Sequence, residues 1–365
     1  MTSIESKSTP CKVVYALTSS GRDFFSAMTR ISATAVRITN PKATIVLACD
    51  DQSVAAMRHS RDPLLDEVDE LITCCTPAGD CVFRNRFVKT QLRCLFDGAF
   101  LFLDSDTLVR DDISKVFFLD ADIACARNES GDVVERQLRA RDKSILSTMR
   151  WSHRQDVFVN GGVIFCNDTL GAAGFFYDWH RKWLSSCRFT KHFCDQPALN
   201  AAIFATKPRL EILPHRFNAQ FKVTPATASN ATIWHFYSSF RDDEPITGFE
   251  HLVVSLIKGT ELRRSHVESI LQHEHPWRRR SWVDDLAARH VVKRGAIHPG
   301  DHLWFQGHRA RSVGFRTLVW TMYLLRLMIG RTMFDRMRRI KFVGRIVLRF
   351  NKKLQDLTRR TIVPQ

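Results

Sequence analysis

The stretch Ala99-Phe-Leu-Phe-Leu103, followed at once by Asp104-Ser105-Asp106, decides how this chain folds. Its apolar residues predict a buried strand that starts after Gly98 and ends at the two acids. In open α/β sheets, ligands bind beyond the carboxyl ends of the strands. Because residues i and i+2 of an extended segment point the same way, Asp104 and Asp106 can share one cation. Carboxylate oxygens suit hard divalent ions, so the pair predicts a Mn²⁺ or Mg²⁺ site.

A second acidic triplet, Asp120-Ala121-Asp122, also follows apolar residues, at 116–119. An Asp-x-Asp triplet by itself is more typical of a solvated loop or a helix cap than of a cation site. The segment before Asp120 is short and resembles a helix end, whereas a full strand-length run precedes Asp104. We therefore assign the cation site to the first pair.

Apolar runs alternate with amphipathic stretches along the first 240 residues. This alternation predicts an α/β fold with a mixed, mostly parallel sheet flanked by helices. Strands are expected at 12–17, 43–48, 71–75, 98–103, 123–126, 163–166 and 233–236. Helices are expected at 23–36, 85–96, 171–187 and 195–204.

Positive charge is concentrated at the end of the chain. The 365 residues carry 54 Lys and Arg against 38 Asp and Glu, a net charge of +16. Residues 301–365 hold 15 basic and 3 acidic side chains, so this segment alone accounts for +12. The first 300 residues are nearly balanced, and their apolar content is that of a globular protein.

The basic segment is also rich in apolar and aromatic residues, especially at 313–349. Its longest apolar run, 317–330, is too short to span a bilayer and contains Arg326. Basic amphipathic helices with aromatic residues typically lie on anionic membranes, and we expect that role here. The alternative is a helix packed on the rest of the protein with a solvated basic face. No nucleic-acid-binding motif accompanies the charge, so no nucleic-acid partner is expected.

The ten cysteines have no Cys-x-x-Cys spacing, and several, such as Cys49 and Cys166, lie within apolar runs. This pattern favours buried free thiols in a reducing compartment over zinc ligands or disulfides. Residues 1–10 lack the apolar stretch of a signal peptide. We expect a cytoplasmic protein that is peripheral to the cytoplasmic membrane face.

Six short motifs follow one another in the first 240 residues. Together they resemble the family-8 retaining glycosyltransferases, which include glycogenins and bacterial lipopolysaccharide galactosyltransferases. The similarity covers about residues 12–240. The motifs are Lys89 on the helix before the acidic strand, 102–109 around the acids, Val159-Asn160-Gly161-Gly162-Val163, Asp195-Gln196-Pro197-Ala198-Leu199-Asn200, Leu213-Pro214 with Phe217-Asn218, and Ile233-Trp234-His235-Phe236.

The resemblance implies a GT-A fold with a Rossmann-like nucleotide-binding half. We expect a catalytic domain at 1–245, divided into a nucleotide-binding half (11–110) and an acceptor half (111–245). The basic helical extension then occupies 246–365. The resemblance also makes His235 the third metal ligand beside Asp104 and Asp106.

The resemblance implies donor contacts for Lys89 and Asn160. We also expect donor contacts for Thr18, which follows the first strand, and for Ser105 and Gly161. Ordinary structural roles compete with several of these assignments. Lys89 could be an exposed helix lysine, Asn160 could serve a tight Gly-Gly turn, and Thr18 could belong to a plain turn.

Asp195 and Gln196 are the expected catalytic residues. Gln196 lies where the family places a residue near the anomeric carbon, but a carboxylate such as Asp195 is the better nucleophile. Asp195 could instead cap the helix that follows, since Pro197 lies in the first turn of that helix. His235 could likewise be a hydrogen-bonded core histidine.

The implied reaction is metal-dependent transfer of a sugar, with retention of configuration, from a UDP-sugar to a glycan or lipid-linked acceptor. An inverting enzyme, or one that glycosylates a protein or itself, is the alternative within the same class. The family's Lys-Pro-Trp element after the histidine is missing, because Phe236-Tyr237-Ser238 follows His235. A catalytically inactive scaffold that binds nucleotide-sugars therefore stays open. A nucleotidyltransferase is disfavoured, since no Gly-rich phosphate loop is present.

Overall fold

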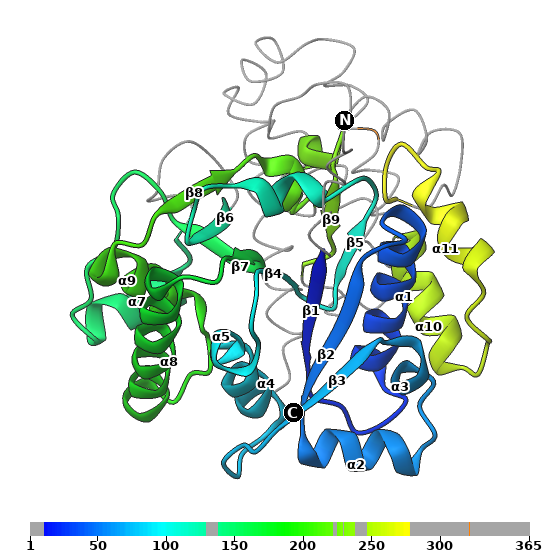
Figure 1. Ribbon diagram of the computed structural model, residues 1–365, viewed down its shortest axis with the longest axis horizontal. Helices are drawn as coiled ribbons and strands as arrows, with labels where there is room; N and C mark the ends of the chain where they lie inside the picture. The colour runs from blue at the N-terminus through cyan, green and yellow to red at the C-terminus, as the bar shows by residue number, and fades with distance from the viewer. Residues whose placement is uncertain are drawn as a thin grey trace, which may run out of the picture. The chain divides into compact units, whose positions relative to one another are not determined.

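The computed structural model describes residues 11–128, 138–221, 225–228, 230–237, 247–277 and 321. A seven-stranded sheet with the order β3-β2-β1-β4-β7-β6-β8 forms its centre (Figure 1). Only β7 runs antiparallel to its neighbours in this sheet. The predicted mixed, mostly parallel sheet flanked by helices is confirmed. Its strands are β1 (Lys12–Leu17), β2 (Thr44–Asp50), β3 (Glu70–Cys74), β4 (Phe100–Leu103), β6 (Ile123–Arg127), β7 (Val159–Cys166) and β8 (Leu210–Leu213).

A separate antiparallel pair joins β5 (Thr107–Val109) to β9 (Ile233–His235). Its register sets Thr107 opposite His235, and the Phe236 amide donates to the Asp106 carbonyl at 2.7 Å. Residues separated by more than 120 positions in the sequence are thereby held side by side at the end of β4.

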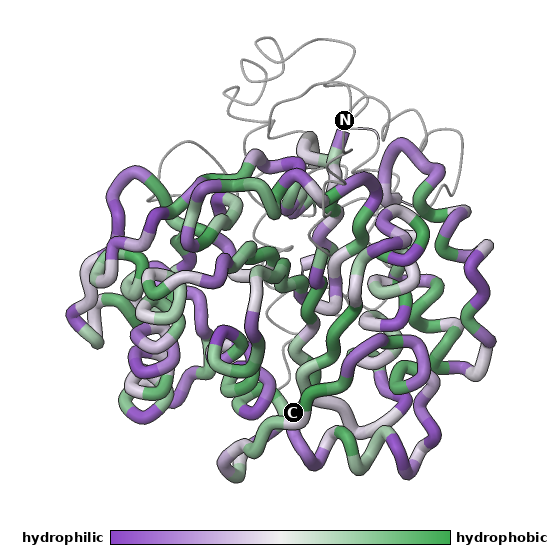
Figure 2. Tube along the Cα trace, viewed as in Figure 1, coloured by the Kyte–Doolittle hydropathy of each residue, from purple (hydrophilic) through white to green (hydrophobic). Residues whose placement is uncertain are grey.

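Helices cover both faces of the main sheet, and each face has its own apolar core. On one face, side chains of α4, α5, α8 and α9 pack on β1, β2, β4, β6 and β7; on the other, α1, α2 and α3 pack on alternate residues of the same strands. Figure 2 shows hydrophobic residues concentrated along the strands. The helices are α1 (Phe24–Thr39), α2 (Asp51–His59), α3 (Leu64–Glu67), α4 (Cys81–Lys89), α5 (Leu92–Leu95), α7 (Ala140–Thr148), α8 (Leu170–Thr190), α9 (Gln196–Thr206), α10 (Gly248–Ile257) and α11 (Arg264–Leu271), with 3-10 turns η1 (Ser114–Phe118), η2 (His215–Phe217) and η3 (Pro225–Ala228).

The helix predicted at 85–96 is two shorter helices, α4 and α5. Asp80 starts α4 earlier than predicted, because its carboxylate accepts a hydrogen bond from the Phe83 amide as an N-cap. Thr90 ends α4, and its hydroxyl lies 2.8 Å from both the Arg86 carbonyl and His180 Nδ1. The break directs Lys89 into the interior instead of along a continuous helix surface.

Strand β7 begins four residues before the predicted start at 163. Asn160, Gly161 and Gly162 are extended in β7 and do not form a turn. Asn200 on α9 holds the beginning of the strand, since its side chain bonds both the amide and the carbonyl of Val159, at 2.8 and 3.0 Å. The Gly162 carbonyl then accepts from the Asp104 amide at 2.8 Å, which joins β7 to the end of β4.

The chain divides into two compact units, Met1–Ile297 and His298–Gln365. Helices α10 and α11 both contact α1, so they belong to the first unit. The boundary predicted from the sequence between the catalytic domain and the C-terminal extension lies earlier, at residue 245. Within the described residues, no helix combines the length and the apolar character needed to cross a membrane. The basic stretch at 313–349 lies outside the described residues, apart from Thr321.

All ten cysteines are free, as predicted. Cys49, Cys125, Cys166 and Cys187 are buried. Burial raises the pKa of Cys125, Cys166 and Cys187 to about 12, so these thiols are protonated packing residues.

Candidate active site

Asp104, Asp106 and His235 converge at the end of β4. One potential ligand atom from each lies within 4.8 Å of the other two, and no other such group of acids, histidines and cysteines occurs in the described parts of the chain. Asp104 follows β4, Asp106 precedes β5, and His235 ends β9. The Thr107 amide donates to the Asp104 carbonyl at 3.1 Å, which closes the turn that carries both acids.

Asn218 orients the imidazole of His235. Asn218 Nδ2 donates to Asn160 Oδ1 at 2.9 Å, so Asn218 Oδ1 is free to accept from His235 Nδ1 at 2.7 Å. With the proton on Nδ1, the lone pair of Nε2 faces the carboxylates, and Nε2 lies 3.3 Å from Asp106 Oδ1. Metal-binding histidines generally donate their second ring N–H to an oxygen in this way. Two carboxylates and one imidazole held like this fit a divalent ion such as Mn²⁺.

The electrostatics agree with a place for positive charge. Burial acts to lower the pKa of His235, but Asp106 and Asp104 outweigh it and raise that pKa above its ordinary value. Burial acts to raise the pKa of Asp106, but His235 outweighs it and lowers that pKa. Asp106 is therefore ionised.

Gly162 provides the space that His235 occupies. A Cβ atom at Gly162 would lie 2.3 Å from His235 Cε1 and 2.9 Å from Nδ1. At Gly161 it would lie 3.3 Å from Leu199 Cδ2 and 3.6 Å from Lys89 Nζ, within reach of a small adjustment. Only the second glycine is required for the imidazole.

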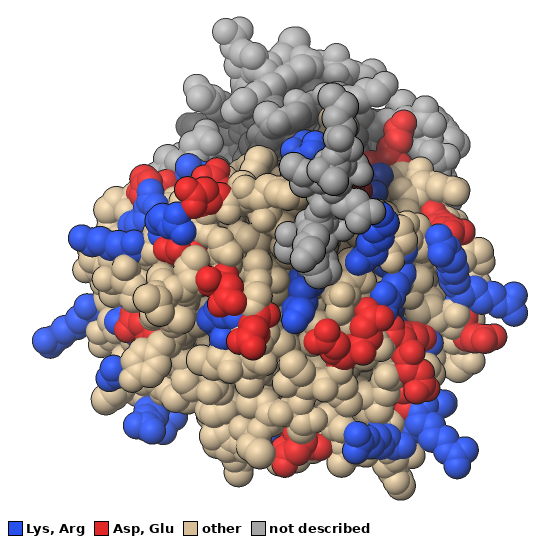
Figure 3. Space-filling model, viewed as in Figure 1, with Lys and Arg blue, Asp and Glu red and all other residues tan. Residues whose placement is uncertain are grey.

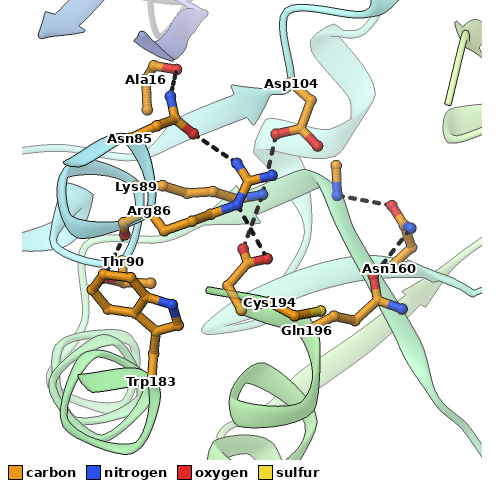
Figure 4. A network of polar contacts seen from close by, with 12 residues as sticks. Ala16, Asn85, Arg86, Lys89, Thr90, Asp104, Asn160, Trp183, Cys194 and Gln196 are labelled. Carbon is orange, nitrogen blue, oxygen red and sulfur yellow. Dashed lines mark hydrogen bonds and ion pairs between the residues drawn. The ribbon is translucent and has the colours of Figure 1, made fainter. Parts of the chain in front are cut away.

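A second charged cluster adjoins the acids (Figure 4). Lys89 is 2% exposed, and its Nζ lies 3.1 Å from Asp104 Oδ1 and 3.2 Å from Asp195 Oδ2. Arg86, one turn earlier on α4, extends beside Lys89 and places its Nε 3.4 Å from Asp195 Oδ1. Burial acts to raise the pKa of Asp195, but Lys89 and Arg86 outweigh it and hold that pKa below its ordinary value.

Two structural alternatives are thereby excluded. Lys89 is not an exposed helix lysine. Asp195 stands at the N-cap position of α9 but makes no side-chain capping bond there. Its carboxylate is directed to the two cations instead.

Asn160 and Gln196 belong to a buried amide network. Asn160 Nδ2 lies 3.2–3.3 Å from side-chain oxygens of Asn128, Gln196 and Gln220. Asn160 Oδ1 accepts from the Gly162 amide at 2.8 Å. Asn160 thus supports the glycine strand and also joins Gln196 on α9 to the metal-ligand side of the site.

Most of these residues line one cavity of about 340 Å³, but Asp106 is not among its lining residues. Of the sequence-predicted residues, its wall contains Lys89, Asp104, Asn160, Gly161, Asp195, Gln196 and His235. Thr18 and Ser105 are engaged elsewhere. The Thr18 hydroxyl is buried and donates to the Cys81 carbonyl at 2.8 Å, and Ser105 Oγ lies 2.8 Å from Thr29 Oγ1.

The second acidic triplet has a structural role. Asp122 accepts hydrogen bonds from the Arg209 amide and the Thr169 hydroxyl, both at 2.8 Å. Arg209 also bonds Asp120 at 2.5 Å. The two acids tie the start of α8 to the loop before β8, and they lie outside the cavity.

Several residues of the site were not predicted as site residues. Arg86 could have been found from its i, i+3 spacing to Lys89 on one helix face. Gln220, Arg139 and Tyr237 carry no comparable local signal. Arg139 lies over the Tyr237 ring, with Cζ 4.4 Å from the ring centre, and both line the cavity.

Comparison with known proteins gives similarity at the level of structure. No family model matches the sequence, and comparison with curated proteins found no match. The galactosyltransferase LgtC, solved with donor and acceptor sugar analogues, is 15% identical over 70% of this chain and 98% of its own, with a TM-score of 0.48. Mouse xyloside xylosyltransferase 1 is 13% identical over 63% of this chain and 98% of its own, with a TM-score of 0.41. Glycosyltransferase GlyE of Streptococcus pneumoniae TIGR4 is 15% identical over 75% of this chain and 66% of its own, with a TM-score of 0.46. At these values the function has to be argued from the site itself.

Proposed function

We propose that this protein is a divalent-metal-dependent glycosyltransferase that takes a sugar from a nucleotide-sugar donor. The observation that carries the proposal is the convergence of Asp104, Asp106 and His235, with the imidazole oriented by Asn218. Asp104 and His235 also line a polar cavity. The sequence motifs shared with retaining glycosyltransferases support a UDP-sugar donor and Mn²⁺, with Mg²⁺ as the alternative.

The metal would be held by Asp104, Asp106 and His235, and it would neutralise charge on the departing diphosphate. Lys89 adds a buried positive charge beside Asp104. Asn160, Gly161 and Gln196 form the adjoining wall, where hydrogen-bonding groups suit a sugar. The ion pairs with Lys89 and Arg86 fix the position of the Asp195 carboxylate.

The environment of Asp195 favours attack on the same face of the sugar over a covalent intermediate. Lys89 and Arg86 both neutralise its carboxylate, which weakens it as a nucleophile. In same-face attack, the bond between C1 and the diphosphate oxygen breaks, and the electron pair leaves with the diphosphate. The acceptor oxygen bonds to C1 from the same side, and its proton passes to the diphosphate. Trapping with a slow donor analogue should give no sugar adduct on Asp195, and a stable adduct would refute this route.

We also propose a glycan or lipid-linked acceptor and attachment to the cytoplasmic face of a membrane. Both proposals rest on the sequence, namely the family resemblance and the basic residues at 301–365. The attachment segment lies outside the described residues.

The inactive scaffold is favoured by one specific feature, the absence of Lys-Pro-Trp after His235. A simple assay distinguishes the inactive scaffold from the enzyme. Nucleotide-sugars are screened for Mn²⁺-dependent hydrolysis with wild-type protein and with Asp106→Asn. Hydrolysis by wild type alone supports the enzyme, whereas donor binding without hydrolysis by either protein indicates the scaffold.

The stereochemistry is tested once a donor and an acceptor are known. NMR of the product gives the anomeric configuration directly. The same anomer as in the donor supports a retaining enzyme, and the opposite anomer indicates the inverting alternative. Mass spectrometry of the protein itself detects self-glycosylation.

A further inference from the structure

One side of the cavity is lined by basic side chains that the steps above do not use. Arg141 lies in the first turn of α7, and Lys191 and His192 lie in the loop between α8 and α9. All three line the same cavity as Asp195 and Gln196. Arg141 Nη2 lies 3.5 Å from the thiol of Cys194, the residue next to Asp195.

The acids of the cavity wall are already engaged. Asp104 and Asp195 pair with Lys89 and Arg86, and Asp80 caps α4. Asp142 caps α7, where its carboxylate accepts from the Arg139 amide at 3.3 Å and from the Cys194 thiol at 3.7 Å.

Arg141 and Lys191 consequently lack a carboxylate partner within ion-pair distance among the residues that the structure describes. Unpaired cations that share a cavity raise the local concentration of anions.

The wall that carries these cations is rigidly held. The indole of Trp183 donates to the Phe193 carbonyl at 3.2 Å, and the indole of Trp179 donates to the Asp195 carbonyl at 3.1 Å. Both tryptophans are fully buried in α8. Lys191 ends that helix in a left-handed conformation, with φ of 58°. The backbone of the loop that carries Lys191 and His192 is therefore held at both ends.

We propose that the acceptor carries an anionic group, a phosphate or a carboxylate, which Arg141, Lys191 and His192 bind beside the sugar site. The inference rests on the proposed function and specifies its acceptor. We expect the donor diphosphate at Asp104, Asp106 and His235. Lys89 bonds Asp104 on one side and Asp195 on the other, and Arg141 lies beyond Asp195, next to Cys194. The guanidinium of Arg141 can bind phosphate or carboxylate through two hydrogen bonds, and the N-terminus of α7 adds a favourable dipole.

The test uses the full-length protein saturated with UDP and Mn²⁺, so that the donor site is filled. Calorimetry measures the binding of glucose 6-phosphate, glucuronate and neutral glucose. We expect at least one of the two anionic sugars to bind at least tenfold more tightly than glucose, and the stronger of the two identifies the anion. Arg141→Gln and Lys191→Gln should each weaken that binding by about tenfold and leave UDP affinity unchanged. Arg188→Gln is the matched control, because Arg188 is exposed on α8 but does not line the cavity.

Three results separate the failure of this inference from that of the proposed function. If UDP and Mn²⁺ bind but neither anionic sugar binds more tightly than glucose, the acceptor inference is overturned and the glycosyltransferase proposal stands. The acceptor inference is also overturned if Arg141→Gln weakens the binding of UDP instead, because Arg141 then binds the donor. If UDP with Mn²⁺ does not bind wild-type protein, the proposed function fails first.

Discussion

Gly162 offers the sharpest test of the metal site at the scale of single residues. We predict that Gly162→Ala lowers Mn²⁺ affinity at least tenfold, because the added methyl would lie 2.3 Å from His235 Cε1 and displace the ring. Gly161→Ala is the matched control in the neighbouring position of β7, where the nearest atom belongs to a flexible leucine. Electron paramagnetic resonance of bound Mn²⁺ measures both variants. Equal affinities would show that the imidazole is not a ligand.

Lys89 is expected to matter for stability as well as for the donor. Its ammonium lies between two carboxylates, and removing one partner of a buried ion pair leaves uncompensated charge. We predict that Lys89→Met lowers the free energy of unfolding by about 3–5 kcal/mol. In the double variant Lys89→Met, Asp195→Asn, the loss should be smaller than the sum of the two single losses. Urea denaturation measures all four proteins, and additive losses would contradict the coupling.

Most of the residues of the site could be predicted from the sequence, but their contacts could not. Asp104 and Asp106 were recognisable because an apolar strand precedes them, and His235 because it lies within a predicted strand that carries a family motif. The Nδ1 bond from His235 to Asn218 depends on η2, a short turn with no periodic signal. The pairing of Lys89 with Asp195 likewise depends on how α4 meets α9, and no local pattern encodes that contact.

At the scale of elements, the strands were predicted better than the segments between them. β1 is found at its predicted position, and β4 and β6 differ by a residue or two. Short elements with weak patterns, such as β5, β8 and α7, were missed. The tight Gly-Gly turn, which was the alternative role for Asn160, is not formed, because both glycines are extended in β7. Gly162 is required there because His235 occupies the space that a side chain would fill.

The contact between α4 and α8 has a pH dependence that can be measured. His180 on α8 lies edge-on to Phe87 at 5.0 Å, and burial lowers its pKa to about 4 from an ordinary value of 6.5. Between pH 6.5 and 4 the unfolded chain binds a proton at His180 that the folded protein does not, so stability falls as the pH is lowered through that window. We predict that His180→Gln shows a smaller decrease in unfolding free energy from pH 7 to pH 4.5. An identical decrease in both proteins would mean that His180 is protonated in the folded state.

At the scale of the whole molecule, charge is unevenly distributed along the chain. On the face shown in Figure 3, Lys and Arg are interspersed with Asp and Glu over the described residues. The net charge of +12 in residues 301–365 stands apart from this balance. An ordinary solvated surface does not require such an excess, and attraction to anionic lipid is the role that we propose for it.

We predict that removing the residues after 312 releases the protein from membranes. Sedimentation with vesicles of neutral and anionic lipid compares the full-length and shortened chains. The full-length chain should sediment with anionic vesicles and be released by added salt, since the attraction is electrostatic. If the shortened chain still sediments, the basic segment is not the attachment site.

The central claim is that one divalent ion is held jointly by Asp104, Asp106 and His235 beneath a nucleotide diphosphate. Anomalous diffraction from crystals grown with Mn²⁺ and UDP tests it most directly, since manganese is located independently of the protein. We predict one strong peak in contact with both carboxylates, with His235 Nε2 and with the diphosphate. A peak elsewhere, or UDP bound with these three side chains unligated, would contradict the account.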